Sequence, residues 1–314
     1  MKIVAVEPIG ISPEKAKEIA AELAAMGHEF VFYPDRKEDA ESLCARMKEA
    51  EVVIISNIPL PAAVLSECPK LKHIALAFTG KDHIDGAYCA AHGITIRNAA
   101  GYATRAVGEL AIGLMLDVYR KITALDAETR RGGVRGAFLG RELYGKTVGI
   151  VGTGAIGTYT ARLAQAMGCR VVAWNRSEHT EVRAMGIPYL PLDELLRQSD
   201  VVSLHVPLTQ ETHHLISAEK LALCRPSAIL INTARGNVVD MEALAAALRE
   251  GRLAGAGLDV YEKEPPLPAE HPLLQAPNVV LAPHVGYATR EAFDMRIDIV
   301  LEHLREYLRE EAHA

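Results

Sequence analysis

The sequence predicts an α/β protein of two units, each built on a parallel β-sheet with helices on both faces. Strand-like and helix-like segments alternate from the first residues onward, which is the pattern of strands joined by helical crossovers. A second series of this kind begins at Thr147, after a glycine-rich stretch at residues 131–140. With 314 residues, 49% of them hydrophobic, the chain is long enough to form two cores.

The first series consists of short apolar runs that predict strands and amphipathic runs that predict helices. Strands are expected at residues 2–6, 29–32, 52–56, 73–77 and 94–97, and helices at residues 13–26 and 37–50. Polar loops at residues 78–82 and 98–102 follow the last two of these strands. Because open parallel sheets bind ligands beyond the carboxyl ends of their strands, both loops are expected to contact a ligand.

A long apolar helix expected at residues 104–121 separates the two series, and the first unit therefore closes near residue 101. Strands of the second series are expected at residues 147–151, 170–174, 201–205, 228–232, 255–260 and 279–282. Asp240 is a suitable N-cap for a helix that ends at Gly251. The last helix, at residues 289–310, has no strand after it and is expected to return the chain to the first unit.

These elements predict Rossmann-like or flavodoxin-like sheets, with one unit inserted into the other. The discontinuous unit would comprise residues 1–101 plus 287–314, and the continuous unit residues 102–286. The first is expected to bind a substrate and the second a dinucleotide.

The glycines at the start of the second series indicate the dinucleotide site. Gly152, Gly154 and Gly157 form the pattern G-x-G-x-x-G between the strand at 147–151 and a helical pattern that runs to Gly168. The first glycine permits a tight turn, the second lets the backbone approach a pyrophosphate, and the third lets the helix pack on the strand. The N–H groups at the start of the helix would then hold the anion.

The residues after the next strand bear on which dinucleotide binds. An acidic side chain about 20 residues beyond the glycines commonly binds the ribose hydroxyls of NAD, but Asn175, Arg176 and Ser177 stand there in this chain. No carboxylate would repel the 2′-phosphate of NADP, and Arg and Ser can both donate to it. We expect a preference for NADP. In the alternative, Asn175 bonds the ribose, Arg176 stacks on adenine, and NAD is used as well.

Composition and charge exclude several classes of partner. The net charge is −6 and no basic block is present, so neither nucleic acid nor a membrane surface is an expected partner. No apolar run approaches the roughly 18 residues of a transmembrane helix, and no signal peptide is evident. Five cysteines without a C-x-x-C pair read as reduced thiols, so a cytoplasmic protein with a small-molecule partner is expected.

No metal site is expected. Two adjacent histidines, His213 and His214, would point apart in an extended segment, and no carboxylate or cysteine stands at ligand spacing from them.

Three loops of the second series carry side chains suited to the reduction of a ketone. They contain Arg235, Glu264 and His284, each beyond a predicted strand. A histidine can supply the proton that the carbonyl oxygen needs, since its ordinary pKa is about 6.5. A nearby carboxylate would orient the ring and favour the imidazolium, and the planar guanidinium of an arginine can hold a substrate carboxylate.

At these residues the chain resembles the D-2-hydroxyacid dehydrogenase family. The likeness covers nearly the whole chain, because the motifs occur in the family's order: the loop at 79–85, the glycine motif, residues 233–236, Glu264-Pro265-Pro266, and residues 283–286. It implies reversible hydride transfer between NADP or NAD and a small 2-keto acid, giving the D-2-hydroxy acid. Arg235, Glu264 and His284 would be the catalytic residues, with His284 as the general acid.

The resemblance also implies which residues surround the ligands. Substrate contacts are expected from Thr79, Gly80, Tyr102 and Arg235. Cofactor contacts are expected from Thr104, Gly152, Gly154, Ala155, Ile156, Gly157, Asn175, Arg176, Ser177, His205, Val206, Pro207, Thr212, Thr233, Ala234, Asp259 and Gly286. The helix from Thr104 and the segment at 131–140 resemble the family's dimer-forming region, which implies a homodimer.

The substrate stays open between several acids. Tyr102 is similar to the pocket tyrosine of D-lactate-type members, whereas NADPH use fits glyoxylate or hydroxypyruvate reductases, so glyoxylate, hydroxypyruvate and pyruvate are all candidates. D-3-phosphoglycerate would need further cations, which Lys81 or Arg105 could supply. Formate dehydrogenases have Gln where Glu264 stands, which argues against formate. The scaffold is also similar to that of NAD(H)-sensing corepressors, which act by binding partners.

Overall fold

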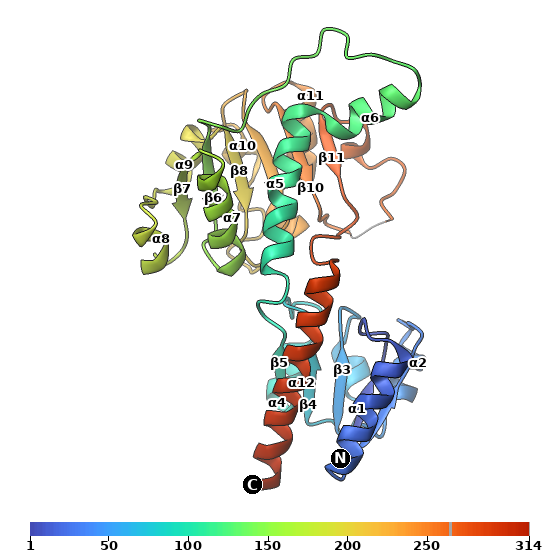
Figure 1. Cartoon of the computed structure of the whole chain (residues 1–314). Coiled ribbons are helices and arrows are strands. Elements are labelled where there is room, and N and C mark those ends of the chain that lie inside the picture. The colour runs from blue at the N-terminus through green and yellow to red at the C-terminus, as the bar shows by residue number, and fades with distance from the viewer. Residues whose placement is uncertain (264–265, 314) are drawn as a thin grey trace. The chain divides into compact units, whose positions relative to one another are not determined.

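The computed structural model describes residues 1–263 and 266–313 and divides them into two compact units. One unit runs from Met1 to Ala103 and resumes at Thr289, and the other is Thr104–Ala288. Each unit is an α/β domain with a wholly parallel sheet (Figure 1), so the predicted fold class is confirmed. Among the described residues, no helix is long and apolar enough to cross a membrane.

The first unit contains a five-stranded sheet in the order β2-β1-β3-β4-β5. Its strands are β1 (Lys2–Ala5), β2 (Glu29–Phe32), β3 (Val52–Ile55), β4 (His73–Leu76) and β5 (Thr95–Asn98). Its helices are α1 (Pro13–Ala25), α2 (Ala40–Met47), α3 (Ala62–Leu65), α4 (Gly86–Ala91) and α12 (Arg290–His313). All residues of β3 and β4 are buried, as expected for inner strands of a parallel sheet that is covered on both faces.

The predicted helix at residues 37–50 was too long at both ends. The observed helix α2 starts at Ala40 because the Asp39 side chain caps it, accepting a hydrogen bond of 2.8 Å from the Ser42 N–H. It ends at Met47. The short helices α3 and α4 were not predicted, because four to six residues are too few to show a helical period.

The second unit contains a six-stranded sheet in the order β11-β10-β9-β8-β6-β7. Its strands are β6 (Thr147–Val151), β7 (Arg170–Trp174), β8 (Val201–Leu204), β9 (Ile229–Asn232), β10 (Gly255–Leu258) and β11 (Val279–Leu281). Its α-helices are α5 (Thr104–Arg120), α6 (Ile122–Arg130), α7 (Ala155–Ala166), α8 (Thr180–Ala184), α9 (Leu192–Gln198), α10 (Ala218–Leu221) and α11 (Met241–Arg249). Short 3₁₀ helices occur at Gly236–Val238 and Pro272–Gln275.

Two apolar cores cover the two faces of this sheet. Helices α5 and α7 pack on one face, which is nearest the viewer in Figure 1, through side chains such as Met115 and Ala161. Helices α9, α10 and α11 pack on the other through Leu195, Leu221 and Leu244. The predicted N-cap of α11 is confirmed, since the Asp240 carboxylate accepts a 3.0 Å hydrogen bond from Ala243 N–H. The result is a doubly wound sheet with both faces covered.

The chain order of this sheet indicates where a ligand would bind. From β6 the chain crosses to β7 on one side, whereas β8 to β11 follow on the other side. Beyond β7 a single parallel bridge between Ala173 and Tyr189 stands where a further strand would lie. The crossovers therefore diverge between β6 and β8, and the crevice beyond their carboxyl ends is the usual ligand site of such sheets.

A buried histidine makes the stability of the first unit depend on pH. His73 is fully buried, with Nδ1 2.7 Å from Thr95 Oγ1 and its ring stacked on Tyr307 at 4.1 Å. Burial lowers the pKa of His73 to about 4. In the unfolded chain this side chain binds its proton near pH 6.5, so the stabilisation present above that pH is lost as pH falls from 6.5 towards 4.

We expect the His73 contribution to the free energy of unfolding to fall by about 2 kcal/mol between pH 7 and pH 5. Urea denaturation of the protein and of His73→Leu at both pH values measures the difference, since the other titrating groups are common to both. The variant should lose less stability than the parent on acidification. Equal losses would contradict the assignment.

Candidate active site

Each of the three glycines in the turn after β6 is required, or permitted, for a different structural reason. Gly152 has φ of +100°, and a Cβ there would lie 2.7 Å from the His205 backbone. A Cβ on Gly157 would lie 1.9 Å from the Gly152 carbonyl oxygen. A Cβ on Gly154 would meet no atom within 4 Å. The protein's own packing therefore requires the first and third glycines, whereas the second leaves open space that a ligand can fill.

The start of α7 has the properties of an anion site. Gly154 is its N-cap, no side chain caps the helix, and the Gly154 carbonyl accepts from Thr158 N–H at 2.9 Å. The N–H groups of the first turn carry partial positive charge and lie beside the space over Gly154. This arrangement fits the pyrophosphate of a dinucleotide.

The segment after β7 forms a turn held by Asn175. Its side chain accepts from Thr153 N–H at 3.3 Å and donates to the Ser177 carbonyl at 2.7 Å. Arg176 and Ser177 have exposed side chains. Glu178, the nearest carboxylate in the sequence, is ion-paired with Arg183. The side chains of residues 175–177 thus offer a cation and polar donors without a carboxylate of their own.

The loop after β8 borders the same turn. His205 Nε2 lies 2.9 Å from Ser203 Oγ, and burial lowers the pKa of His205 to about 3, so this ring is neutral at pH 7. Thr212 Oγ1 donates to the Pro207 carbonyl at 2.6 Å and closes the loop. A hydrogen bond from Thr209 and, to a smaller extent, the Arg176 guanidinium lower the pKa of Glu211. The charges of Arg176 and Glu211 therefore act on each other.

Arg235 is positioned by a buried asparagine at the end of β9. Asn232 is fully buried, donates to the Arg235 carbonyl at 2.9 Å and accepts from Ala234 N–H at 3.0 Å. Arg235 itself donates to the Ala234 carbonyl at 2.8 Å. A Cβ on Gly236 would lie 1.8 Å from the Tyr261 carbonyl carbon. The arginine loop and the loop after β10 are therefore packed backbone to backbone.

Asp259 fixes the backbone that directly follows His284. The buried Asp259 carboxylate accepts from Val285 N–H and from Gly286 N–H, each at 2.8 Å. Tyr261 Oη donates to the Ala282 carbonyl at 2.9 Å, just before the histidine. His284 has φ of +55°, an unusual backbone conformation that is more frequent at functional sites. Sequence reasoning gave no positioning role to Asn232 or Tyr261, because neither belongs to a recognised acid–base pattern.

The remaining expected residues have the following places. At the carboxyl edge of the sheet, Ala155 and Ile156 begin α7, Val206 follows β8, Thr233 follows β9, and Thr104 begins α5. Thr233 Oγ1 is buried without a partner among the described residues, which fits a site completed by a ligand. Glu264 lies outside the described residues. His213 and His214, expected to point apart, instead stack at 4.1 Å because His214 has φ of +49°.

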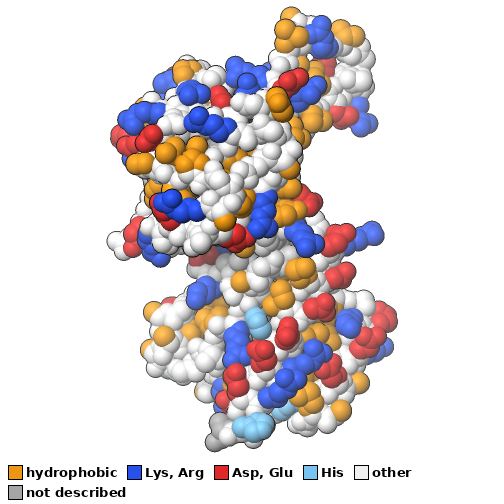
Figure 2. Space-filling view, turned by 60° about the vertical axis from the view of Figure 1, so that its left-hand side comes forward, with side chains coloured by type: hydrophobic (Ala, Val, Ile, Leu, Met, Phe, Trp, Pro, Cys, Tyr) orange, Lys and Arg blue, Asp and Glu red, His pale blue; other side chains and the backbone are white. Residues whose placement is uncertain are grey.

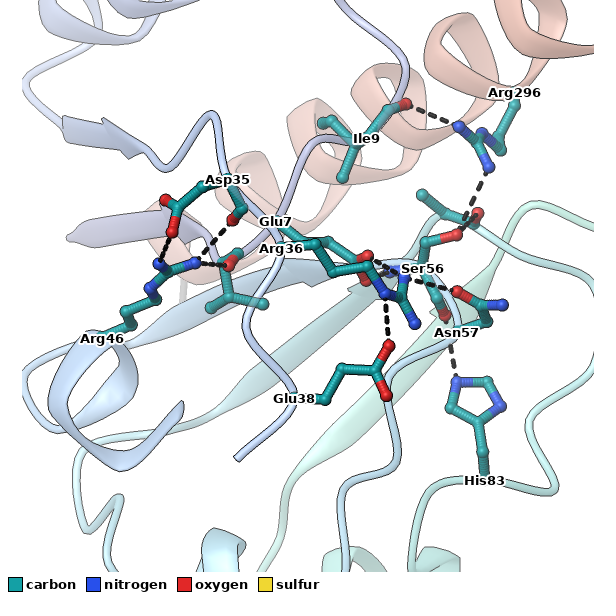
Figure 3. Close-up of polar contacts among 12 residues, drawn as sticks. Glu7, Ile9, Asp35, Arg36, Glu38, Arg46, Ser56, Asn57, His83 and Arg296 are labelled. Carbon is teal, nitrogen blue, oxygen red and sulfur yellow. Dashed lines mark hydrogen bonds and ion pairs between the residues drawn. The ribbon is translucent and has the colours of Figure 1, made fainter. Parts of the chain in front are cut away.

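The expected substrate residues Thr79, Gly80 and Tyr102 belong to the first unit. The Thr79 carbonyl accepts from Asn98 at 2.6 Å, and the buried Tyr102 ring lies 5.8 Å from the Arg296 guanidinium. The neighbouring end of β3 is held by a polar network, in which Ser56 bonds Glu7, Arg296 and His83 (Figure 3). Burial raises the pKa of Glu7. These contacts give the loop after β4 a rigid neighbour.

Comparison with known proteins gives one family. Residues 112–286 match the model of the NAD binding domain of the D-isomer-specific 2-hydroxyacid dehydrogenases. The chain is 40% identical to the glyoxylate reductase of Korarchaeum cryptofilum, over 85% of this chain and 82% of the relative.

Solved structures of this kind are similar to the chain over nearly its whole length. A glyoxylate reductase from Paecilomyes thermophila superposes with a TM-score of 0.88 at 31% identity, covering 98% of this chain and 95% of that one. D-lactate dehydrogenase from Aquifex aeolicus, solved with NAD and lactic acid, gives a TM-score of 0.84 at 29% identity over 100% and 97% of the two chains.

The different surroundings of Gly154 and Gly157 lead to different expected effects of alanine. Gly157→Ala should destabilise the protein by about 1–3 kcal/mol or more, because the methyl group overlaps the Gly152 carbonyl. Gly154→Ala should retain the fold but weaken dinucleotide binding, because its methyl group occupies the space proposed for the pyrophosphate. Thermal denaturation and titration of the fluorescence of Trp174, the chain's one tryptophan, measure the two effects. Full binding by Gly154→Ala would contradict the site.

Proposed function

Because the chain belongs to the D-isomer-specific 2-hydroxyacid dehydrogenase family and is an NAD(P)-dependent 2-keto acid reductase, we propose that it reduces a small 2-keto acid with NADPH as the preferred cofactor. The proposed substrates are glyoxylate, hydroxypyruvate or pyruvate. Their support is the 40% identity to a glyoxylate reductase and the similarity to a D-lactate dehydrogenase structure. The observation that carries the cofactor preference is the cationic, carboxylate-free segment at residues 175–177.

The bound nicotinamide supplies the hydride. In this proposal Arg235 binds the substrate carboxylate through its planar guanidinium, which fixes the keto carbon in place. His284 donates the proton that the carbonyl oxygen takes up, and Glu264 orients the imidazole. The packed loops that contain Asn232, Asp259 and Tyr261 would keep the side chains of Arg235 and His284 in fixed positions. We also propose that the backbone N–H groups of Thr79 and Gly80, with Tyr102, bind the substrate, as the family resemblance implies.

The remaining parts of the proposal concern the cofactor. Its pyrophosphate would lie at Gly154 and the start of α7, and a 2′-phosphate would lie at Arg176 and Ser177. Arg176 also feels the carboxylate of Glu211, whose negative charge opposes that of a phosphate. This opposition supports a moderate preference for NADPH with residual use of NADH.

We also propose that the protein is a homodimer. The segment after α6 exposes large apolar side chains, with Val134 and Leu139 each 82% exposed, and Figure 2 shows apolar surface on this projecting segment at the upper right. Apolar surface of this kind marks an interaction site where it is contiguous, and the similarity of this segment to the family's dimer-forming region is what assigns it to a partner subunit. The five free cysteines support a reducing, cytoplasmic location.

The cofactor proposal is tested by kcat/KM for NADPH and NADH with glyoxylate, hydroxypyruvate and pyruvate. We expect NADPH to be favoured, and Arg176→Gln to lower its kcat/KM about tenfold, because a hydrogen bond to a charged group contributes about 1.5–3 kcal/mol. The value for NADH should change less than twofold, since NADH has no 2′-phosphate. A tenfold advantage of NADH in the parent protein would refute the preference.

The role of Asp259 is tested by Asp259→Asn, which places an amide NH₂ against one of the two N–H donors of residues 285 and 286. Because a displacement of about 1 Å can reduce the rate about 100-fold, we expect kcat to fall by 10- to 100-fold. Asp240→Asn is the matched control, since asparagine caps a helix as well as aspartate does. A kcat of Asp259→Asn within twofold of the parent would show that the carboxylate does not position His284.

A further inference from the structure

We propose that Tyr189 is a positioning residue of the cofactor site, whose hydroxyl holds the segment after β7 in the conformation that receives a 2′-phosphate. The inference rests on the proposed NADP site and assigns its geometry to a side chain outside the glycine motif and outside residues 175–177. Tyr189 precedes α9 and follows the glycine-containing turn after α8.

The Tyr189 hydroxyl joins two segments that meet at the carboxyl edge of the sheet. It lies 2.8 Å from Thr153 Oγ1, in the middle of the glycine turn. It also accepts a hydrogen bond of 3.0 Å from His179 N–H, two residues beyond Ser177. Since the hydroxyl has one proton, acceptance from His179 leaves that proton available to Thr153.

The base of this tyrosine is fixed independently of its hydroxyl. Its backbone forms the single bridge to Ala173 on the outer edge of β7. Two hydrogen bonds of 2.9 Å support the bridge, from Ala173 N–H to the Pro188 carbonyl and from Leu190 N–H to the Ala173 carbonyl. The backbone bridge therefore holds the ring, and the hydroxyl links Thr153 to His179; we call this link the tie. Removal of the hydroxyl oxygen should remove the tie without moving the ring.

The segment between Asn175 and His179 carries the proposed phosphate ligands. Arg176 and Ser177 have exposed side chains, so packing against the core does not hold them. The segment's inner end is held by Asn175, which bonds Thr153 N–H and the Ser177 carbonyl. Its outer end is held at His179 by Tyr189. A segment fixed at both ends loses less conformational entropy when it binds a ligand, which favours affinity.

The effect of this tie should depend on the ligand. NADP and NAD differ only in the 2′-phosphate, and the tied segment lies at that end of the proposed site. Loss of the tie should weaken NADP and leave NAD nearly unchanged. A tyrosine that merely stabilised the fold would weaken both dinucleotides alike.

The test is the affinity of Tyr189→Phe for NADP⁺ and NAD⁺, measured by calorimetry and by Trp174 fluorescence, the tryptophan being the last residue of β7. We expect the Kd for NADP⁺ to rise about five- to tenfold, as for one net hydrogen bond, with the Kd for NAD⁺ within twofold. In steady-state assays KM for NADPH should rise while kcat at saturating NADPH is retained.

Three further variants distinguish loss of the Tyr189 hydrogen bonds from general damage to the fold. Thr153→Val keeps the shape of Thr153 but removes its hydroxyl, and it should reproduce part of the effect, with a Tyr189→Phe/Thr153→Val double variant that is less than additive. Tyr119→Phe is the matched control, because it removes another tyrosine hydroxyl of this unit, which donates to the Asp200 carbonyl at 3.2 Å. It should leave both affinities unchanged.

The outcomes distinguish this inference from the proposed cofactor preference. The quantity that decides is the ratio of the two Kd values in Tyr189→Phe relative to the same ratio in the parent protein. An unchanged ratio, with both affinities lowered or neither, overturns the role of Tyr189. A parent protein that favours NADH refutes the NADP preference, yet a changed ratio in the variant would still support the tie.

Discussion

The close approach of α7 to the turn after β6 is the constraint on which the second unit depends. Gly157 faces the Gly152 carbonyl so closely that no side chain fits between them, and Gly152 in turn lies against the His205 backbone. These contacts place the start of α7 directly over the end of β6 and beside the loop after β8. The start of α7, the turn after β6 and the loop after β8 are therefore packed together as one rigid structure. This packing leaves an open space over Gly154 that a ligand can fill.

The proposed catalytic side chains, near the β11 edge of the sheet, are held by buried hydrogen bonds to the backbone. Arg235 and His284 follow strands β9 and β11, which β10 separates. The loop after β10 connects them, because Asp259 bonds the backbone beside His284, Tyr261 bonds the residue before Pro283, and Gly236 packs on Tyr261. Buried polar groups that are satisfied by backbone partners keep such loops in one conformation. Preorganisation of this kind is what the proposed proton transfer requires, since the donor must stay within hydrogen-bond reach of the substrate.

Much of this architecture could be predicted from the sequence because its strands are continuous apolar runs and its glycines have one spacing. The six strands of the second unit and the cap at Asp240 were found in that way, with errors of one or two residues at strand ends. Asp39 was a visible cap signal as well, yet the predicted helix began before it. The single bridge at Tyr189 could not be predicted, since one paired residue has no period. Asn232 bonds residues two and three positions away, but it belongs to no recognised acid–base pattern. Tyr261 bonds Ala282, 21 residues away, and no local pattern encodes a contact of that range.

The separation of the two ends of this sheet has a consequence for specificity. The residues proposed to choose between the two dinucleotides lie beyond β7 and β8, whereas the proposed catalytic residues Arg235 and His284 lie beyond β9 and β11. The charge at Arg176 can therefore change with little effect on the proposed catalytic residues. Exposed charges such as Arg176 and Glu211 are also weakly constrained by packing, which makes them easy to exchange during evolution. What cannot be exchanged so easily is the scaffold that presents them. Tyr189, fixed by its backbone bridge and joined to Thr153, belongs to that scaffold, and in our proposal it links cofactor choice to the glycine turn.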